Sequence, residues 1–199
     1  MSQIRVSVFA LLMFVVFGGV GVAQRPGPQF RRPLTCEPLK PRTKLEALDW
    51  HYERVLIKGF SQMATLDVRG ADVRLDAVEL KEAETAARAI GLVIALREPG
   101  DNPRENRSFI DYDEIDRLLK ALDTISKVNE SVTKLAGFEA RYRTLGDLEI
   151  NVFRQSRTGT AVSVTSGTCD RVTSLLTLDE LDRLKAHIVE AKTRLDEIK

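Results

Sequence analysis

An eleven-residue segment occurs twice in this 199-residue chain, 66 positions apart, and this repeat constrains the fold more than any other feature of the sequence. Residues 108–118 read SFIDYDEIDRL and residues 174–184 read SLLTLDELDRL, so that six positions are identical and three more are apolar in both copies. Each copy begins as the end of an apolar strand and continues into an acidic helix start. The repeat therefore predicts two units that each end in a strand followed by a helix.

The start of each repeated helix carries a capping signal. Asp111 with Glu114, and Thr177 with Glu180, have the spacing of a capping box, in which each side chain accepts a hydrogen bond from a backbone N–H of the first helical turn. Both helices then continue with one apolar stripe at helical spacing. The stripes are Ile115, Leu118, Leu119, Leu122, Ile125 and Val128 in the first copy, and Leu181, Leu184, Ile188, Ala191, Leu195 and Ile198 in the second.

The segments before each helix alternate between apolar and polar residues, which is typical of half-buried strands. The second unit has three turn signals between its strands: Gly146-Asp147, Thr158-Gly159 and Ser166-Gly167. In the first unit, residues 52–57 and 63–68 are candidate strands, and a change of face near Val78 indicates a β-bulge. Residues 90–96 are almost continuously apolar, as in a strand that is covered on both faces.

These patterns predict an α+β fold built from two tandem β-meander-plus-C-terminal-helix units, at residues 43–132 and 133–199. Neither unit alone is long enough for much of a core, so we expect the two units to pack together as one domain.

The first 23 residues have the features of a secretory signal peptide. One base, Arg5, is followed by an apolar run that ends in small residues, which predicts cleavage between Ala23 and Gln24 and a secreted or periplasmic protein. An uncleaved membrane anchor is the alternative, because the run is close to the shortest that can span a bilayer. Residues 24–42 contain five of the seven prolines and predict an extended, basic linker.

The chain has two cysteines, Cys36 in the linker and Cys169 in the second unit. An oxidising compartment would allow them to form a disulfide that ties the linker to the folded core. Their spacing indicates neither a redox motif nor a metal site, so pairing and two free thiols remain the alternatives.

The charge distribution argues against binding to nucleic acid. The whole chain has a net charge of +1, but its first 42 residues are basic, and residues 43–199 hold 24 bases and 28 acids. Nucleic-acid-binding domains usually present an excess of Lys and Arg to the phosphates. We therefore expect no nucleic-acid partner.

The sequence resembles two groups of known proteins. Residues 126–129, 138–144, 146–147, 166–167 and 191–192 (SKVN, FEARYRT, GD, SG and AK) resemble a group of uncharacterised secreted bacterial proteins over about 75 residues. This resemblance implies an exported bacterial envelope protein and no particular chemistry. The tandem strand-plus-helix topology is similar to the Whirly family of single-stranded-DNA-binding proteins, although no binding motif of that family matches here.

The sequence contains no motif of a common enzyme class. The patterns GxSxG, HExxH, GxxxxGK[ST] and GxGxxG are all absent. The acids Asp111, Asp113, Glu114 and Asp116 lack the glycine and the spacing of a calcium loop. We expect no enzymatic activity, no cofactor and no metal.

The hypothesis that follows is a non-enzymatic interaction or structural module of the bacterial envelope, whose partner is an envelope protein or a surface polymer. After signal cleavage we expect no membrane span. The alternative is a small-ligand or carbohydrate site in a cleft between the two units, with Trp50, His51, Tyr52 and Tyr142 as aromatic candidates. The C-terminal helix also leaves open a homodimer seam, although packing on its own sheet is the stronger expectation for its stripe.

Overall fold

The computed structural model describes residues 40–50, 52–155 and 159–199. The predicted signal peptide, its cleavage site at Ala23 and Gln24, and nearly all of the linker lie outside these residues. The described residues all belong to one compact unit.

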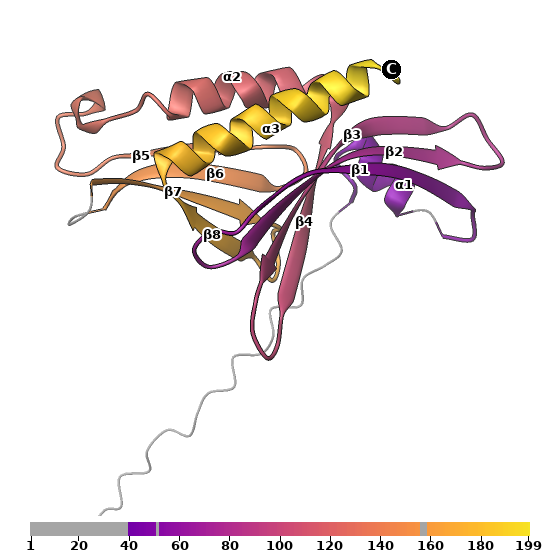
Figure 1. Ribbon diagram of the computed structural model, residues 1–199, viewed down its shortest axis with the longest axis horizontal. Coiled ribbons are helices and arrows are strands. Elements are labelled where there is room, and N and C mark those ends of the chain that lie inside the picture. Colours follow the sequence, from indigo (N-terminus) through magenta and orange to yellow (C-terminus); the bar gives the residue numbers. More distant parts are fainter. Residues whose placement is uncertain (1–39, 51, 156–158) are drawn as a thin grey trace, which may run out of the picture. The chain divides into compact units, whose positions relative to one another are not determined.

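The first half of this unit is an antiparallel meander of four strands, and the second half repeats that architecture (Figure 1). A short helix, α1 (Lys44–Asp49), precedes the first sheet, which consists of β1 (Leu56–Leu66), β2 (Asp72–Glu82), β3 (Arg88–Glu98) and β4 (Arg104–Asp111). The 3-10 turn η1 (Tyr112–Glu114) leads into α2 (Ile115–Ile125), and a second such turn, η2 (Glu130–Val132), leads to the second sheet. That sheet consists of β5 (Glu139–Arg143), β6 (Leu148–Gln155), β7 (Gly159–Ser166) and β8 (Val172–Leu176), followed by α3 (Leu178–Asp196). The predicted α+β fold with two tandem strand units is confirmed.

The two copies of the repeated segment occupy equivalent places and connect the two units reciprocally. Ser108 in β4 and Ser174 in β8 are both fully buried. The Oγ of Ser108 lies 2.7 Å from the Oγ of Ser166 in the second unit, and the Oγ of Ser174 donates to the carbonyl oxygen of Ala71 in the first unit at 2.7 Å. Three of the apolar repeat positions that follow are also buried in both copies: Ile110, Ile115 and Leu118, and Leu176, Leu181 and Leu184.

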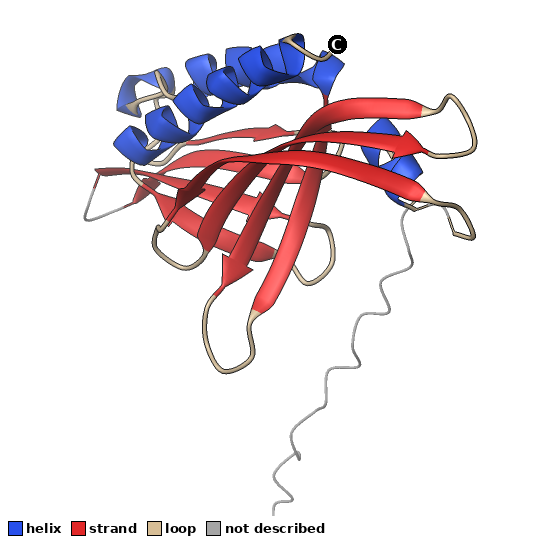
Figure 2. Cartoon of the chain, turned by 45° about the vertical axis from the view of Figure 1, so that its right-hand side comes forward, coloured by secondary structure: helices blue, strands red, loops and turns tan. Residues whose placement is uncertain are grey.

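One main core fills the space between the two sheets and the two long helices. α2 and α3 lie side by side over the strands, and α3 contacts strands of both sheets (Figures 1 and 2). The expected stripe of α3 packs into this core, because Leu181, Leu184, Ile188 and Leu195 are at most 1% exposed. The residues considered for a dimer seam on α3 are therefore used inside the chain, apart from Ile198.

A second, smaller core lies on the opposite face of the first sheet, under α1. Leu45 and Leu48 of α1 pack there against Val78 and Leu80 of β2 and Val93 of β3. The close approach depends on a glycine in β3, because a Cβ at residue 91 would lie 2.8 Å from a methyl group of Leu45.

This second core explains two differences from the sequence-based expectations for the first unit. No bulge occurs at Val78, since β2 pairs with β3 in continuous register and the change of face reflects burial on both faces. The bulge lies in β1, between Gln62 and Ala64. β1 is also one strand, where the sequence indicated two. The expectation that residues 90–96 form a strand covered on both faces is confirmed.

α1 was not expected, although its start carries a clear signal. Thr43 and Glu46 form a capping box: the Oγ1 of Thr43 accepts from the Glu46 N–H at 3.0 Å, and the Glu46 carboxylate accepts from the Thr43 N–H at 3.1 Å. The pattern Thr-x-x-Glu directly after a proline-rich segment could have identified this helix. None of the helices in the described part of the chain is long and apolar enough to span a bilayer.

Candidate interaction edge and candidate pocket

The structure places Tyr142 apart from the two other described aromatic candidates, Trp50 and Tyr52. Trp50 ends α1 and Tyr52 follows it, 85% exposed. Tyr142 lies in β5, where it packs on the main core and where burial raises the pKa of its hydroxyl. α1 belongs to the second core, on the other face of the first sheet. His51 lies outside the described residues.

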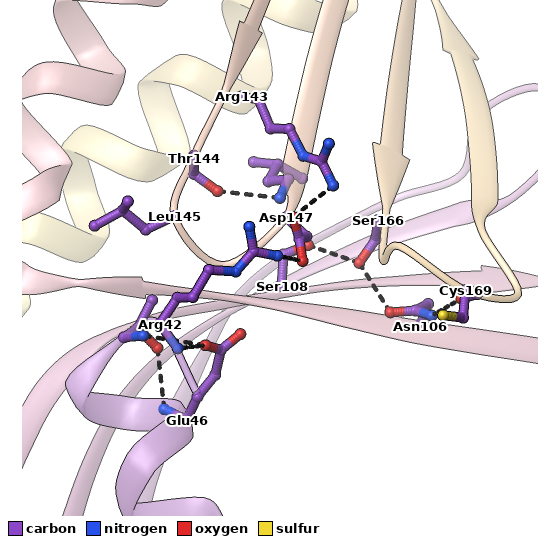
Figure 3. A network of polar contacts seen from close by, with 12 residues as sticks. Arg42, Glu46, Asn106, Ser108, Arg143, Thr144, Leu145, Asp147, Ser166 and Cys169 are labelled. Carbon is purple, nitrogen blue, oxygen red and sulfur yellow. Dashed lines mark hydrogen bonds and ion pairs between the residues drawn. The ribbon is translucent and has the colours of Figure 1, made fainter. Parts of the chain in front are cut away.

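Cys169 lies in the turn between β7 and β8 and is disulfide-bonded. Its backbone carbonyl accepts a hydrogen bond from the Asn106 side-chain amide at 3.2 Å, at the end of a partly buried polar chain that also includes Ser166 and Ser108 (Figure 3). Cys36 lies outside the described residues, so its pairing with Cys169 stays a prediction.

The most apolar exposed segment of the described chain leads into and along β1. β1 is an edge strand, since it pairs with β2 and stands first in the strand order of its sheet. Val55, Ile57 and Phe60 are 59%, 54% and 67% exposed. An exposed edge strand with large apolar side chains is a site for strand addition by another polypeptide.

The apolar side chains of β1 lie on both faces of the sheet. Phe60 is opposite Val78, which faces α1, whereas Ile57 is opposite Lys81 and faces the α3 side. A small groove of about 170 Å³ lies on the α3 side, between β1 and the end of α3, and Ile198 lines it. Both faces of this edge therefore offer apolar contacts.

Two features limit how much of β1 can accept another strand. The bulge after Gln62 interrupts the regular pairing, so the regular part of the edge runs over residues 56–62. Lys58 is the only charged residue of β1, and it makes no ion pair with any other described residue. A strand that is added here would therefore meet three large apolar side chains, two uncharged polar side chains and one unpaired ammonium group.

A second candidate site lies where α1, the start of α2 and the β5–β6 turn meet. Asp111, at the end of β4, is 7% exposed and accepts two backbone hydrogen bonds from the first turn of α1. Its carboxylate oxygens lie 2.7 Å from the Lys44 nitrogen and 3.0 Å from the Leu45 nitrogen. The predicted capping box between Asp111 and Glu114 is therefore wrong, since neither side chain caps α2. The matching prediction for Thr177 and Glu180 is confirmed.

Asp147 holds the β5–β6 turn against the segment before α1. Its carboxylate forms ion pairs with Arg42 and with Arg143 (Figure 3). Asp147 is 8% exposed and has a φ of 63°, in the left-handed region that Asp adopts more readily than most residues. The neighbouring Gly146 allows β4 to approach, because a Cβ there would lie 1.9 Å from the carbonyl oxygen of Phe109.

Glu114 is the buried acid of this junction. It is 3% exposed, and its Oε1 accepts the Leu145 N–H at 2.9 Å. Its Oε2 is buried and has no hydrogen-bond partner among the described residues. Burial raises the pKa of Glu114 above its usual range, and the Asp111 and Asp113 charges add to this effect; the Leu145 hydrogen bond and the positive charge of Arg117 act against it.

An open pocket with a volume of about 370 Å³ lies beside Glu114. Its charged lining consists of three cations and three acids: Arg42, Lys44 and Arg117, and Asp111, Asp113 and Glu114. Lys44 and Asp113 form an exposed ion pair at 2.8 Å, and this hydrogen bond lowers the pKa of the Asp113 carboxyl. Arg117 is exposed and forms no ion pair with another described residue. In the described part of the chain, no group of three His, Cys, Asp or Glu side chains is arranged to hold a metal ion.

Comparisons with known proteins add nothing to this geometry. No family model matches the chain, and a search of curated proteins finds no significant match. The resemblances to secreted bacterial proteins and to the Whirly family therefore stay predictions.

Proposed function

We propose that this protein is an exported, non-enzymatic interaction module that binds an extended segment of a partner polypeptide along β1. The observation that carries the proposal is the row of exposed apolar side chains at this open edge, Val55, Ile57 and Phe60. Proteins that leave an edge strand free usually protect it with charged residues, because its unpaired N–H and C=O groups attract other strands. β1 has one charge and leaves two of its large apolar residues, Ile57 and Phe60, exposed.

Strand addition would use the backbone for affinity and the side chains for selectivity. The partner segment would hydrogen-bond to the regular part of β1, residues 56–62. Its side chains would alternate between the two faces, with apolar residues beside Phe60 on one face and Ile57 on the other. An acidic residue beside Lys58 would neutralise the only charge of the strand. The proposed partner is therefore an extended, apolar segment with one acid.

Site-specific photocrosslinking in the native host tests where the partner binds. A crosslinking amino acid replaces Phe60 on β1, or Val189 on the exposed face of α3, which is the control because it is also a large, exposed apolar residue. We expect a discrete crosslinked species from position 60 and none from position 189.

The purified partner then tests the mode of binding. We expect its addition to slow amide hydrogen exchange in residues 56–62, and we expect Phe60→Asp to weaken binding at least tenfold while Val189→Asp leaves it unchanged. Exchange that slows elsewhere with β1 unaffected, or full binding by Phe60→Asp, would refute the proposal. A crosslink between two copies of this chain would also refute it, because a second copy would then occupy the edge.

A further inference from the structure

We propose that the groove between β1 and the end of α3 receives one aromatic side chain of the added strand, at the position opposite Gly59. The inference rests on the function proposed above, because it requires a strand at the β1 edge. It specifies which residue of the partner determines selectivity. Two observations carry it: Gly59 has no structural role inside the described chain, and the groove beside it is large enough for one ring.

Gly59 lies in the middle of the regular part of β1, but nothing in the described chain requires a glycine there. Its φ is not in the left-handed region. A Cβ at this position would meet no atom closer than 3.9 Å, and that atom belongs to Glu79 on β2. Glycine in the interior of a strand commonly marks a bulge or a place where a ligand or another backbone comes close. Since the bulge lies after Gln62, the missing side chain at residue 59 leaves room for a group from outside the chain.

The groove lies beside Gly59 on the α3 side of the sheet. Its apolar walls are formed by Ala77 of β2, Leu195 of α3 and Ile198. Ala77 and Leu195 are buried members of the main core, whereas Ile198 is 40% exposed. An apolar cavity of about 150 Å³ holds a benzene molecule. The groove volume of about 170 Å³ therefore suits one phenyl ring.

The two charged residues that line the groove already have partners. Glu79 forms ion pairs with Lys81 and Arg88, and Arg194 forms one with Glu197. A charge on the entering side chain would therefore find no free partner in the groove lining. The guanidinium of Arg194 can also lie against the face of a ring, which favours an aromatic side chain over an aliphatic one.

The register of the edge extends this inference to three consecutive residues of the partner. Neighbouring residues of a strand point to opposite faces of the sheet. We expect the partner to run antiparallel to β1, as neighbouring strands do throughout this sheet. The residue before the aromatic one then lies beside Phe60, and the residue after it lies beside Lys58. The partner segment therefore contains an apolar residue, an aromatic residue and an acid, in this order.

Fluorescence anisotropy of the full chain with three labelled peptides tests the inference. Each peptide alternates Thr and Val on either side of a central triplet, which is Ile-Phe-Asp, Ile-Leu-Asp or Ile-Ala-Asp. We expect the Phe peptide to bind at least tenfold more tightly than the Ala peptide, with the Leu peptide between them. Amide hydrogen exchange with each peptide bound should slow in residues 56–62, which locates the peptide at the β1 edge.

Gly59→Val tests the groove directly, because its side chain fills the space and its Cβ makes only ordinary contacts. We expect this variant to bind the Phe and Ala peptides equally, and binding of the Ala peptide also shows that the variant is folded. Gly137→Val is the matched control, since Gly137 also faces open space but lies outside the groove. It should keep the preference of the wild type. Ile198→Ala removes one wall of the groove, so it should weaken binding of the Phe peptide and leave the Ala peptide unchanged.

The outcomes separate this inference from the proposed function. If all three peptides bind equally and protect residues 56–62, or if Gly59→Val keeps the preference for Phe, strands add to β1 but the groove does not select an aromatic side chain. If no peptide protects residues 56–62, strand addition at β1 is itself wrong, and the inference about the groove is overturned with it.

Discussion

Replacement of Asp111 by alanine tests how the start of the folded domain is held in place. The Asp111 carboxylate accepts the Lys44 N–H and the Leu45 N–H, which belong to the first turn of α1. α1 has only six residues and is too short to be stable alone, so it depends on this cap and on its contacts with β2 and β3. Loss of the carboxylate should therefore loosen α1 while the two sheets remain folded.

The expected cost follows from the environment of the two N–H groups. A hydrogen bond to a charged group contributes about 1.5–3 kcal/mol to stability. Lys44 is exposed, so water can replace part of the lost bond, whereas Leu45 is fully buried and its N–H would lose its side-chain acceptor. We expect Asp111→Ala to lower the free energy of unfolding by about 2–4 kcal/mol. A typical domain has about 5–15 kcal/mol in total, so the variant should still fold.

Urea unfolding gives this difference, and Asp113→Ala is the matched control. Asp113 is two residues away and also contacts Lys44, but both side chains of that ion pair are more than 60% exposed. An exposed pair contributes little, so we expect the control to lose no more than about 0.5 kcal/mol. Amide hydrogen exchange should show faster exchange in α1 and unchanged exchange in the first turn of α2.

Two outcomes would refute this reasoning. Equal destabilisation by the two substitutions would mean that burial of the Asp111 hydrogen bonds has no special value. Faster exchange at the start of α2, with α1 unaffected, would mean that Asp111 caps its own helix, as the sequence alone suggests.

Three further predictions concern the junction and the disulfide. Glu114→Gln should become more stable than the wild type as pH rises above about 4.5, because the raised pKa means that the wild type loses stability as this buried carboxyl ionises. Urea unfolding between pH 4 and pH 8 measures the difference in the free energy of unfolding between the two proteins. A difference that does not change with pH would contradict the prediction. Gly146→Ala should lower the free energy of unfolding by about 1–3 kcal/mol or more, because its Cβ would collide with the backbone of β4. In the control, Gly137→Ala, the added Cβ meets open space, so its melting temperature should change little. Equal melting temperatures for the two variants would refute this prediction. Peptide mapping without reductant should recover Cys36 linked to Cys169 in a mature chain that begins after the predicted signal peptide. A free thiol at either position would show that the two cysteines do not pair.

The fold was largely predictable because its signals are local in the sequence. The repeat at residues 108–118 and 174–184 contains a strand end, a helix start and the beginning of an apolar stripe, and both copies adopt these structures. The burial of Leu118 and Leu184 follows directly from helical spacing. The pairs Gly146-Asp147 and Ser166-Gly167 also located the two turns of the second sheet that the structure describes.

The candidate pocket was not predictable, because its residues meet across long sequence separations. Asp111 and Glu114 have the spacing of a capping box, but their partners lie in α1 and at Leu145, outside the local pattern. Similarly, the change of face at Val78 looks like a bulge until α1 is known to cover the second face of the sheet. Local periodicity contains no information about which distant segment covers a strand.

The distance along the chain between α1 and its cap has a consequence for the order of folding. Asp111 lies 67 residues after Lys44. A chain that emerges from a ribosome, or from an export channel, with its N-terminus first would present α1 long before β4 exists to hold it. We therefore expect the first helix of the domain to be among the last elements to become stable, and to stay accessible to chaperones or proteases until the whole first sheet has formed.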